Sequence, residues 1–531
     1  MLAKLSEIEG KRARLSVGGS PKQIENQHRS GKLTARERIE MLLDPSTFQE
    51  VNLWIRPIRT GFDVDEQELP GDAIIAGFGN IHGRPVYAVS EDFTVLGGTF
   101  GTGFHHKITR MMEMAIEHGI PYVQLIDSGG ERIHDWFGRP GIRPILGGRS
   151  SAGGGTSNLY QAPGLASGVV PLITLMVGPS YAGSAYSPTM ADFYVMRRNT
   201  AFMSVASPDL LKAVTFKDVT QDEIGGSVLH STVTGTADFL LDTDEEVIAK
   251  GRELLTYLPL NYREKSPRVD LGDDPKRREE RLLKIVPVDL SHLYDMHDVI
   301  RAIVDQGVFV ELQEIYAQSL IIGFGRLDGQ TVGIVANNPS QEDGILTLNT
   351  CDKQARFIRW CDAFNVPLII FVDTPGFLFN PDEARSKEGL MRTVPKVTYA
   401  IVEATVPKII VYTGRNFGVA RLIMGNLRLG VDFAYAWPSA RVTRIKPEEA
   451  VERIYRSEIE FSSEPQRVRE EKLKEIYNKF IQFPYHGAEQ AMVDDIIDPR
   501  NTRPILIKTL KHLENKKNPP RPWRKHGLIQ Q

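Results

Sequence analysis

The 531-residue sequence has few cysteines and no strong excess of either charge. Only Cys351 and Cys361 are present, which is too few for a disulfide framework, and no cluster of metal-ligating residues surrounds them. We therefore expect two reduced, buried thiols and no metal site. The 64 basic and 67 acidic residues give a net charge of -3, so no overall electrostatic field attracts nucleic acid or an anionic membrane.

Long apolar runs are also missing. No stretch of about 18 apolar residues could span a bilayer, and the first residues, MLAKLSEIEGKRARLS, contain no apolar core before a small-residue cleavage site. These absences predict a soluble, cytoplasmic protein without membrane insertion and without a nucleic-acid partner. Because single cores stop growing at roughly 250 to 300 residues, a chain of this length is expected to form two domains.

The sequence repeats itself at a nearly constant spacing. Gly77-Phe78-Gly79 matches Gly323-Phe324-Gly325, and Asp127 matches Asp373, in both cases 246 residues later. In each half an apolar, β-branched run (IPYVQLID, VPLIIFVD) follows an amphipathic stretch, a pattern typical of helix, short turn and buried strand. Since a constant offset indicates a duplicated unit, we expect two α/β domains of one fold.

A polar, charge-dense segment separates the two halves. It has no apolar period and is typical of an exposed connection. We therefore predict an N-terminal domain over residues 1–265, a linker over 266–284 and a C-terminal domain over 285–531. Before the first repeat, Thr34 and Glu37 have the spacing of a helix capping box.

The first half contains about ten extra residues, within a glycine- and proline-rich segment over residues 139–164. This composition favours an irregular loop over a helix or strand. A nucleotide-phosphate loop is the alternative, but a Walker motif has a lysine after its last glycine, whereas Thr156 follows Gly155. We expect a flexible or substrate-covering loop.

Small residues follow the second matched strand of each half, where a strand meets a helix. They are Ala182-Gly183-Ser184 and, 236 residues later, Gly418-Val419-Ala420. Small residues at such a junction let a ligand approach backbone amides at the positive end of a helix, which is how oxyanions are held. Close packing would explain one such turn, but its recurrence in both halves favours a functional role.

Other polar residues give weaker signals. His105 and His106 stand at the start of a predicted helix, where adjacent side chains cannot share a face, so solvated or capping roles are favoured over a metal site. Asp127 and Asp373 recur in both halves, which indicates a shared structural turn rather than a catalytic carboxylate.

Many ordered segments together resemble a known family. They include GKLTARERIE, DSGGERI, YSPTMADF, RFIRWCDAFNVPLIIFVDTPGF and YAWPSA, and the likeness runs from Gly31 nearly to the C-terminus. The chain resembles the carboxyltransferase β subunits of propionyl-CoA and acetyl-CoA carboxylases. The resemblance implies two tandem crotonase-type (ClpP/crotonase) domains built from repeated ββα units. It also implies a ring-shaped homo-hexamer, in which the N-terminal domain of one subunit faces the C-terminal domain of another across the active site.

The resemblance further implies a reaction and its partners. In this family CO2 leaves carboxybiotin, and the freed biotin nitrogen takes the α-proton of an acyl-CoA thioester, so no side-chain base is required. The sequence has neither a Met-Lys-Met biotinylation signal nor a glycine-rich ATP-grasp element. A biotin carboxylase and biotin carboxyl carrier protein subunit is therefore an expected partner, with biotin on a separate domain or chain and coenzyme A as part of the substrate.

The resemblance also assigns site residues by position. Backbone amides of Ala182 and Gly183 would hold the oxyanion of the thioester, and those of Val419 and Ala420 would hold the ureido oxygen of biotin. The remaining substrate-binding residues implied by the resemblance are Gly129, Gly130, Ser184, Arg421 and Leu422.

The sequence departs from the family pattern at the second turn. The family usually has Gly-Gly-Ala in each turn, and Val419 resists a positive φ and adds bulk beside the biotin site. Leu422 stands where propionyl-type enzymes often have an aspartate. Arg421 replaces a common tyrosine and could pair with a substrate carboxylate, although an arginine facing the solvent is the plainer explanation.

Three hypotheses follow for the function. The first is the carboxyltransferase component of an acyl-CoA carboxylase. The alternative is a decarboxylase component acting on malonyl-, methylmalonyl- or glutaconyl-CoA, prompted by the altered turns, Arg421 and a long loop similar to that of glutaconyl-CoA decarboxylase α chains. The third is an assembly scaffold with a decayed site, prompted by Val419. The sequence leaves open the acyl group and the direction of CO2 transfer.

Overall fold

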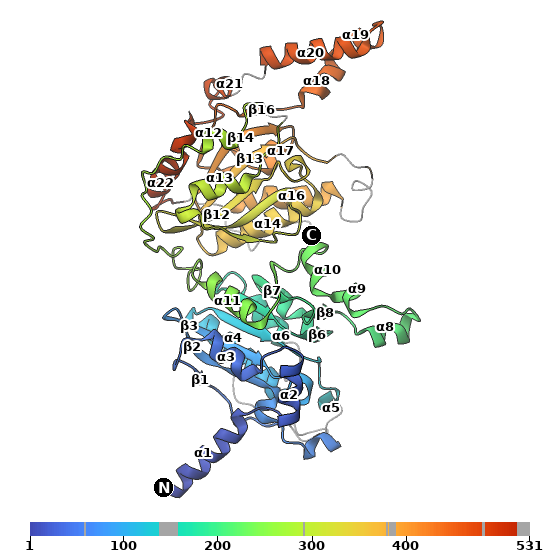
Figure 1. The fold of residues 1–531 in the computed structure, drawn as a ribbon, viewed down its shortest axis with the longest axis vertical. Helices are drawn as coiled ribbons and strands as arrows, with labels where there is room; N and C mark the ends of the chain where they lie inside the picture. The colour runs from blue at the N-terminus through green and yellow to red at the C-terminus, as the bar shows by residue number, and fades with distance from the viewer. Residues whose placement is uncertain are drawn as a thin grey trace. The chain divides into compact units, whose positions relative to one another are not determined.

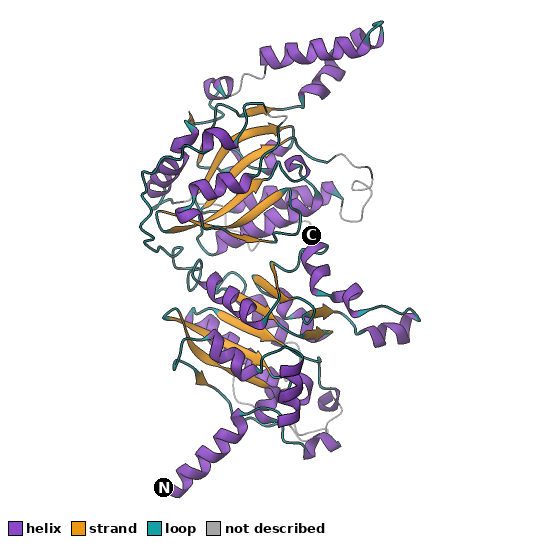
Figure 2. Ribbon diagram, viewed as in Figure 1, coloured by secondary structure: helices purple, strands orange, loops and turns teal. Residues whose placement is uncertain are grey.

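The computed structural model describes residues 1–57, 60–136, 158–289, 292–378, 381, 389–480 and 484–517 (Figure 1). The chain divides into two compact units, Met1–Glu264 and Lys265–Gln531. Each unit contains a mixed sheet flanked by helices (Figure 2), which confirms the α/β class predicted from the sequence. The loop predicted over 139–164 lies outside the described residues as far as 157, and its last residues belong to a helix.

The sheet of the first unit has three antiparallel strands followed by four parallel ones. Its spatial order is β1 (Gln49–Glu50), β2 (Ile74–Ile81), β3 (Arg84–Glu91), β4 (Tyr122–Ile126), β5 (Leu172–Met176), β7 (Phe193–Arg197) and β9 (Phe239–Leu241). Two short strands, β6 (Pro179–Tyr181) and β8 (Phe202–Ser204), pair with each other in parallel. Residues of β4, β5 and β7 are buried throughout, as their continuous apolar runs predict for parallel strands covered on both faces.

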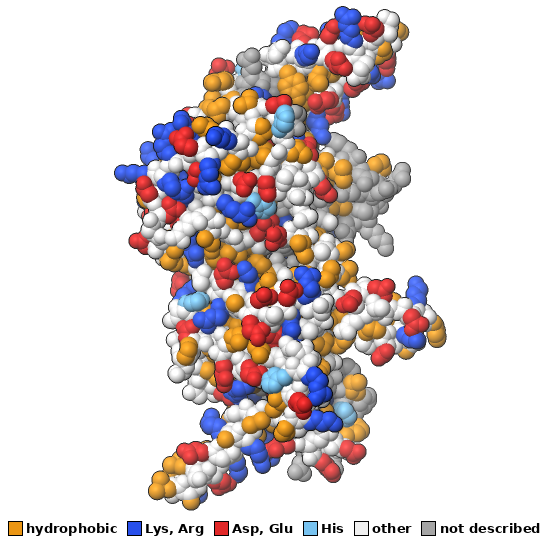
Figure 3. All heavy atoms as spheres, in the orientation of Figure 1, with side chains coloured by type: hydrophobic (Ala, Val, Ile, Leu, Met, Phe, Trp, Pro, Cys, Tyr) orange, Lys and Arg blue, Asp and Glu red, His pale blue; other side chains and the backbone are white. Residues whose placement is uncertain are grey.

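Helices surround this sheet and continue the chain beyond it. They are α1 (Leu2–Ser16), α2 (Pro21–Arg29), α3 (Ala35–Leu42), α4 (Thr102–His118), α5 (Ile133–Trp136), α6 (Asn158–Ala166), α7 (Gly183–Tyr186), α8 (Pro208–Thr215), α9 (Gln221–Gly225), α10 (Ser227–Thr232) and α11 (Asp244–Leu255). The capping box predicted from Thr34 and Glu37 is present at the start of α3: the Glu37 N–H lies 3.3 Å from the threonine hydroxyl, and the Glu37 carboxylate accepts from the Thr34 N–H. Acidic and basic side chains are intermixed on the face shown in Figure 3, in keeping with the balanced composition.

The second unit repeats this architecture. Its sheet runs in the order β10 (Val310–Leu312), β11 (Leu320–Leu327), β12 (Gln330–Asn337), β13 (Leu368–Thr374), β14 (Lys408–Phe417), β15 (Phe433–Ala436) and β17 (Asp495–Ile496), with β16 (Arg441–Thr443) also on β14. Its helices are α12 (Leu282–Ile285), α13 (Met296–Ile303), α14 (Leu348–Ala363), α16 (Leu390–Glu403), α17 (Ala420–Ile423), α18 (Pro447–Ile454), α19 (Arg456–Glu460), α20 (Pro465–Phe480), α21 (Tyr485–Glu489) and α22 (Thr502–His512).

The segment predicted as a linker, 266–284, belongs to the second unit. Arg268 forms a β-bridge with Gln330, and Leu282 is buried in the core of that unit. The charge-dense segment is therefore attached to the second unit at both ends, by a β-bridge near its start and by core packing near its end. Composition does not reveal this attachment, because it depends on a single apolar residue, Leu282, among charged neighbours.

The repeat extends to buried polar contacts. Lys107, in α4, is fully buried and donates to two backbone carbonyl oxygens at 2.7 and 2.8 Å. Its counterpart 246 residues later, Lys353 in α14, is also buried and donates to two carbonyl oxygens at 3.0 and 2.7 Å. A buried ammonium is costly unless its protons are hydrogen-bonded. The two units therefore stabilise their buried lysines in the same way, with two backbone carbonyl acceptors each.

A buried carboxylate stands at the carboxyl end of β4. Asp127 is inaccessible to solvent and lies 2.8 Å from Lys32 and 2.9 Å from Arg38, which also bonds Asp244 at 2.9 Å. Burial alone would raise the pKa of Asp127, but the charges of Arg38 and Lys32 outweigh it and hold the pKa below its ordinary value. This stabilisation is present above the pKa of the unfolded carboxyl and is lost in acid, as pH falls through the folded value.

The same arrangement recurs at the end of β13. Asp373 is buried and lies 2.8 Å from the guanidinium of Arg415. Each aspartate is pressed against a glycine of the next strand: an ideal Cβ would lie 1.8 Å from the Asp127 carboxylate at Gly178 and 2.1 Å from the Asp373 carboxylate at Gly414. Only glycine fits at these two positions, so both aspartates have the structural contacts expected of a shared turn.

Replacing Arg38 by methionine would leave Asp127 and Asp244 without a cation that both contact in the interior. We expect the first unit to lose about 3 to 5 kcal/mol of unfolding free energy, the usual cost of an uncompensated buried charge. Arg29→Met is the matched control, because Arg29 is exposed and pairs with Glu25 at the surface, and should have little effect. Urea unfolding followed by hydrogen exchange of peptides from residues 1–264 measures both; equally small effects would contradict the buried network.

Candidate functional site

The small-residue turn of the first unit lies between β6 and α7. Ala182 has φ 51° and ψ -129°, and its N–H donates to the carbonyl of Ser204 in β8 at 3.0 Å. The next two amides, those of Gly183 and Ser184, have no acceptor among the described residues. The turn therefore leaves two adjacent N–H groups without an acceptor at the start of a short helix.

The turn of the second unit, between β14 and α17, has the same hydrogen bonding. Gly418 has φ 62°, and its N–H donates to the carbonyl of Thr443 in β16 at 3.0 Å. Val419 has φ -72° and ψ -20°, and within the described part of the chain the amides of Val419 and Ala420 have no acceptor. The positive φ falls on the glycine, so Val419 is not strained, in contrast to the concern raised by the sequence.

The equivalence of the two turns changes one assignment. Ala182 was expected to donate its N–H to an oxyanion, but that N–H is engaged by the pairing of β6 with β8. The residues that match Val419 and Ala420 are Gly183 and Ser184, and these are the candidate donors in the first unit. Ala182 sets the turn instead, in a conformation that costs a non-glycine residue about 1 to 2 kcal/mol.

Gly129 and Gly130 lie beside the first turn. Gly130 has φ 99°, and an ideal Cβ on it would lie 3.6 Å from the Tyr181 carbonyl oxygen and 4.0 Å from the Ser184 hydroxyl. The N–H groups of both glycines are engaged within the unit. The two predicted glycines therefore lie next to the turn and pack against it, but neither has an N–H group available for a ligand.

The predicted substrate residues of the second turn have contrasting surroundings. Leu422 and Val419 expose 43% and 55% of their surface. Arg421 is half-buried, and its Nε is enclosed without a hydrogen-bond partner. Burial lowers the pKa of Arg421, and the charges of Arg444 and then Arg428 contribute further lowering. Among the described residues none of these three arginines has a carboxylate within salt-bridge distance.

Three polar side chains beside the first turn were not identified from the sequence as a site. The Glu131 carboxylate lies 3.2 Å from Nε2 of His105, and its other oxygen, Oε1, is enclosed without a hydrogen-bond partner. Tyr160 donates its hydroxyl proton to the carbonyl oxygen of Gly183 at 3.1 Å. These residues come from α4, from the turn after β4 and from α6, so no motif spacing could have linked them.

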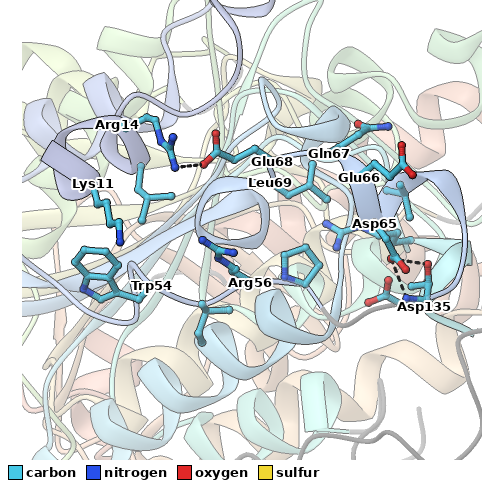
Figure 4. A pocket seen from close by; sticks show the side chains of 16 residues that line it. Lys11, Arg14, Trp54, Arg56, Asp65, Glu66, Gln67, Glu68, Leu69 and Asp135 are labelled. Atoms are coloured by element: carbon cyan, nitrogen blue, oxygen red, sulfur yellow. Dashed lines mark hydrogen bonds and ion pairs between the residues drawn. The ribbon is translucent and has the colours of Figure 1, made fainter. Parts of the chain in front are cut away.

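A cavity of about 540 Å³ lies elsewhere in the first unit (Figure 4). It is lined by α1 and by residues from the segment 54–69, together with Arg132 and Asp135. None of the predicted site residues lines it. The two turns lie at the surface of their units, where Ala182 and Val419 are exposed.

In the part of the chain that the structure describes, no group of three His, Cys, Asp or Glu could hold a metal ion. No helix there is long and apolar enough to cross a bilayer.

The strain at the first turn can be measured by exchanging residues between the two turns. Ala182→Gly should raise the stability of the first unit by about 1 kcal/mol, because glycine adopts a positive φ freely. Gly418→Ala should lower the stability of the second unit by about 1 to 2 kcal/mol through strain alone, since no atom lies within 4 Å of the added Cβ. Ala185→Gly, in α7, is the control and should destabilise. Thermal unfolding checks all three, and a destabilising Ala182→Gly would contradict the strained conformation.

Comparisons with known proteins cover nearly the whole chain. Residues 26–529 match the family model described as the carboxyl transferase domain. The chain is 41% identical over 526 residues to the propionyl-CoA carboxylase carboxyltransferase subunit of Haloferax mediterranei, covering 99% of each chain. It is 39% identical over 526 residues to the methylmalonyl-CoA decarboxylase subunit alpha of Veillonella parvula, covering 99% of this chain and 98% of that one.

A solved structure shows the same fold. The transcarboxylase 12S hexamer, determined with methylmalonyl-coenzyme A and methylmalonic acid bound, superposes with a TM-score of 0.91 at 38% identity, covering 100% of this chain and 99% of that one. These matches confirm the resemblance and the crotonase-type fold inferred from the sequence. The chain belongs to the carboxyl transferase family and is a biotin-dependent acyl-CoA carboxyltransferase.

Proposed function

We propose that this chain is the carboxyltransferase component of a biotin-dependent acyl-CoA carboxylase and carboxylates the α-carbon of an acyl-CoA. The observation that carries the proposal is the pair of equivalent turns, each with two adjacent, unengaged N–H groups. An enolate concentrates negative charge on the thioester oxygen, and donors that are already fixed in place stabilise it without reorganisation. Gly183 and Ser184 supply these donors in the first unit.

The second turn fits biotin, which supplies the carboxyl group in this family. The amides of Val419 and Ala420 would hold its ureido oxygen. Gly418 has no atom within 4 Å of the position of an added Cβ, so a flat ring can approach the backbone there. The exposed side chain of Val419 narrows the approach without closing the turn, which argues against a decayed site kept only as a scaffold.

We also propose a homo-hexamer with active sites between subunits, served by a biotin carboxylase and biotin carboxyl carrier protein subunit. Both turns lie at the surface of their own unit rather than in an enclosed cavity. In each unit, helices that follow the turn project from the sheet, α8–α10 in the first and α18–α20 in the second (Figure 1). They expose aromatic side chains, with Phe216 at 90% and Phe461 at 89%. Such apolar surface favours contacts with further chains.

Val419→Pro tests the second turn directly. Proline removes the N–H, and its fixed φ near -65° suits the observed -72°. We expect carboxylation of propionyl-CoA, reconstituted with ATP, bicarbonate and a biotin-carrying partner, to slow by about 100- to 1000-fold. Val419→Ala keeps the N–H and should stay within a few-fold of the original rate. Equal rates for the two variants, or no carboxylated product from any acyl-CoA with the unaltered chain, would refute the proposal.

The arginines at the second turn favour a substrate that carries a carboxylate. Like charges close to Arg421 repel one another, and a planar carboxylate would both relieve that repulsion and accept paired hydrogen bonds. A decarboxylase also takes a carboxylated acyl-CoA, so the same residues support the alternative function. One of the relatives is a methylmalonyl-CoA decarboxylase subunit. Release of CO2 from malonyl- or methylmalonyl-CoA without ATP would favour that direction.

Glutaryl-CoA and pentanoyl-CoA test whether the arginines select a substrate carboxylate, because the two thioesters differ only in a terminal carboxylate or methyl group. We expect the chain to bind glutaryl-CoA about 10- to 100-fold more tightly, the usual effect of a charge-assisted pair, and Arg421→Met to abolish the difference. Arg456→Met, which alters an exposed arginine paired with Glu460, is the control. Isothermal titration measures all three, and equal affinities for both thioesters in the unaltered chain would contradict carboxylate selection.

A further inference from the structure

A tyrosine hydroxyl reaches the backbone of the first turn from a helix that precedes it in the chain. Tyr160, in α6, donates its hydroxyl proton to the carbonyl oxygen of Gly183 at 3.1 Å. The helix itself is anchored, because Ala162 and Ala166 are buried in the core of the first unit. The hydroxyl therefore approaches the turn from an element that is fixed independently of it.

This hydrogen bond acts on one of the candidate donors, because both belong to the same peptide group. A peptide group is planar and trans, so its C=O and N–H point in opposite directions and move together. The Gly183 carbonyl and the Ser184 N–H form one such group. A donor on the carbonyl side fixes the direction of the Ser184 N–H. It also polarises the group, which makes that N–H a stronger donor.

The neighbouring peptide group and the second turn have equivalent bonds. The Gly183 N–H shares its peptide group with the carbonyl of Ala182, which accepts the N–H of Ala185 at 3.0 Å. In the second unit, the carbonyl of Val419 corresponds to that of Gly183 and accepts the N–H of Leu422 at 2.8 Å. The same peptide group is thus bonded at its carbonyl in both units, and in the first unit a side chain supplies a donor.

The protonation of Tyr160 and the length of α7 both suit this role. Burial, and then the charges of Glu131 and Tyr186, raise the pKa of Tyr160, so the phenol stays protonated and remains a donor. The helix α7 has only four residues, and a single helical turn is not stable by itself. The orientation of its first peptide groups therefore depends on contacts from outside the helix.

We propose that Tyr160 is a positioning residue for carboxyl transfer, which holds and polarises the peptide group whose Ser184 N–H donates to the thioester oxygen. Tyr160 neither touches the substrate nor moves a proton. The inference rests on the proposed function for the placement of the thioester. An enolate carries more negative charge on this oxygen than the ground-state thioester does. The contribution of Tyr160 is therefore larger in the transition state and appears in kcat rather than in KM.

Tyr160→Phe removes only the hydroxyl. In the reconstituted carboxylation of propionyl-CoA we expect kcat to fall about 3- to 10-fold, the usual size of one neutral hydrogen bond, with an unchanged KM for propionyl-CoA. Tyr186→Phe is the matched control, because its ring lies 6.3 Å from that of Tyr160 and its hydroxyl makes no hydrogen bond within the described residues. This control should keep the original kcat. An unchanged kcat for Tyr160→Phe, equal losses in both variants, or a change in KM alone would overturn the inference.

Infrared spectroscopy separates the inference from the proposed function. The full chain binds propionyl-CoA isotopically labelled at its thioester carbonyl, without biotin, ATP or bicarbonate. Because hydrogen-bond donors polarise this carbonyl, its stretching frequency should fall on binding. Tyr160→Phe should lose part of this shift, whereas Tyr186→Phe should keep all of it. An equal shift in Tyr160→Phe and the unaltered chain would overturn the inference and leave the proposed function standing. No shift in the unaltered chain would overturn both the inference and the placement of the thioester.

Discussion

The buried aspartate at the carboxyl end of the central strand is the constraint on which each unit depends. Asp127 and Asp373 are each packed so tightly against a glycine of the next strand that no Cβ fits there, and both carboxylates are ion-paired. The glycine lies only a few residues before the small-residue turn, so the carboxylate fixes where the strand ends and where the turn begins. In the first unit the cations come from the segment before the repeat, whereas in the second Arg415 of the adjoining strand supplies the charge. The N-terminal segment, through Lys32 and Arg38, therefore helps to hold the strand end that precedes the first turn.

Each turn follows this fixed strand end and leaves two adjacent backbone N–H groups without an acceptor. In each, the first residue has a positive φ and gives its N–H to a short parallel strand, which leaves the next two N–H groups without an acceptor. In the first unit the residue with positive φ is Ala182, so the backbone is strained there. This residue orients the candidate donors, and such strain is common at functional sites. Donors that are held rigidly before the substrate arrives need no reorganisation when charge develops. The fold, rather than any side chain of the turn, provides this arrangement.

Much of the fold was predictable because the signals were local or repeated. The duplication, the α/β class, the capping box of α3 and the positions of both turns follow from spacing and from patterns within a few residues. The engagement of the Ala182 amide was not, because its acceptor lies in β8, more than twenty residues later, and strand register cannot be read from the turn. The concern about Val419 was misplaced for a related reason: the sequence gives the residue but not which position of the turn takes the positive φ. The cluster of Glu131, His105 and Tyr160 depends entirely on tertiary packing.

The two turns have equivalent backbones but opposite surroundings. Glu131 forms an isolated parallel bridge with Phe100, and the corresponding bridge in the second unit joins Leu346 to Phe377. An apolar ring therefore occupies the place of the carboxylate, and the groups near the second turn are arginines. The two turns therefore share their backbone hydrogen bonding but differ in the charge beside them, with a carboxylate at the first and arginines at the second. Backbone amides can hold an oxyanion in the same way at both turns, whereas only the second turn has cations that could pair with a carboxylate. The side chains around the turns, rather than the turns themselves, thus distinguish the two units.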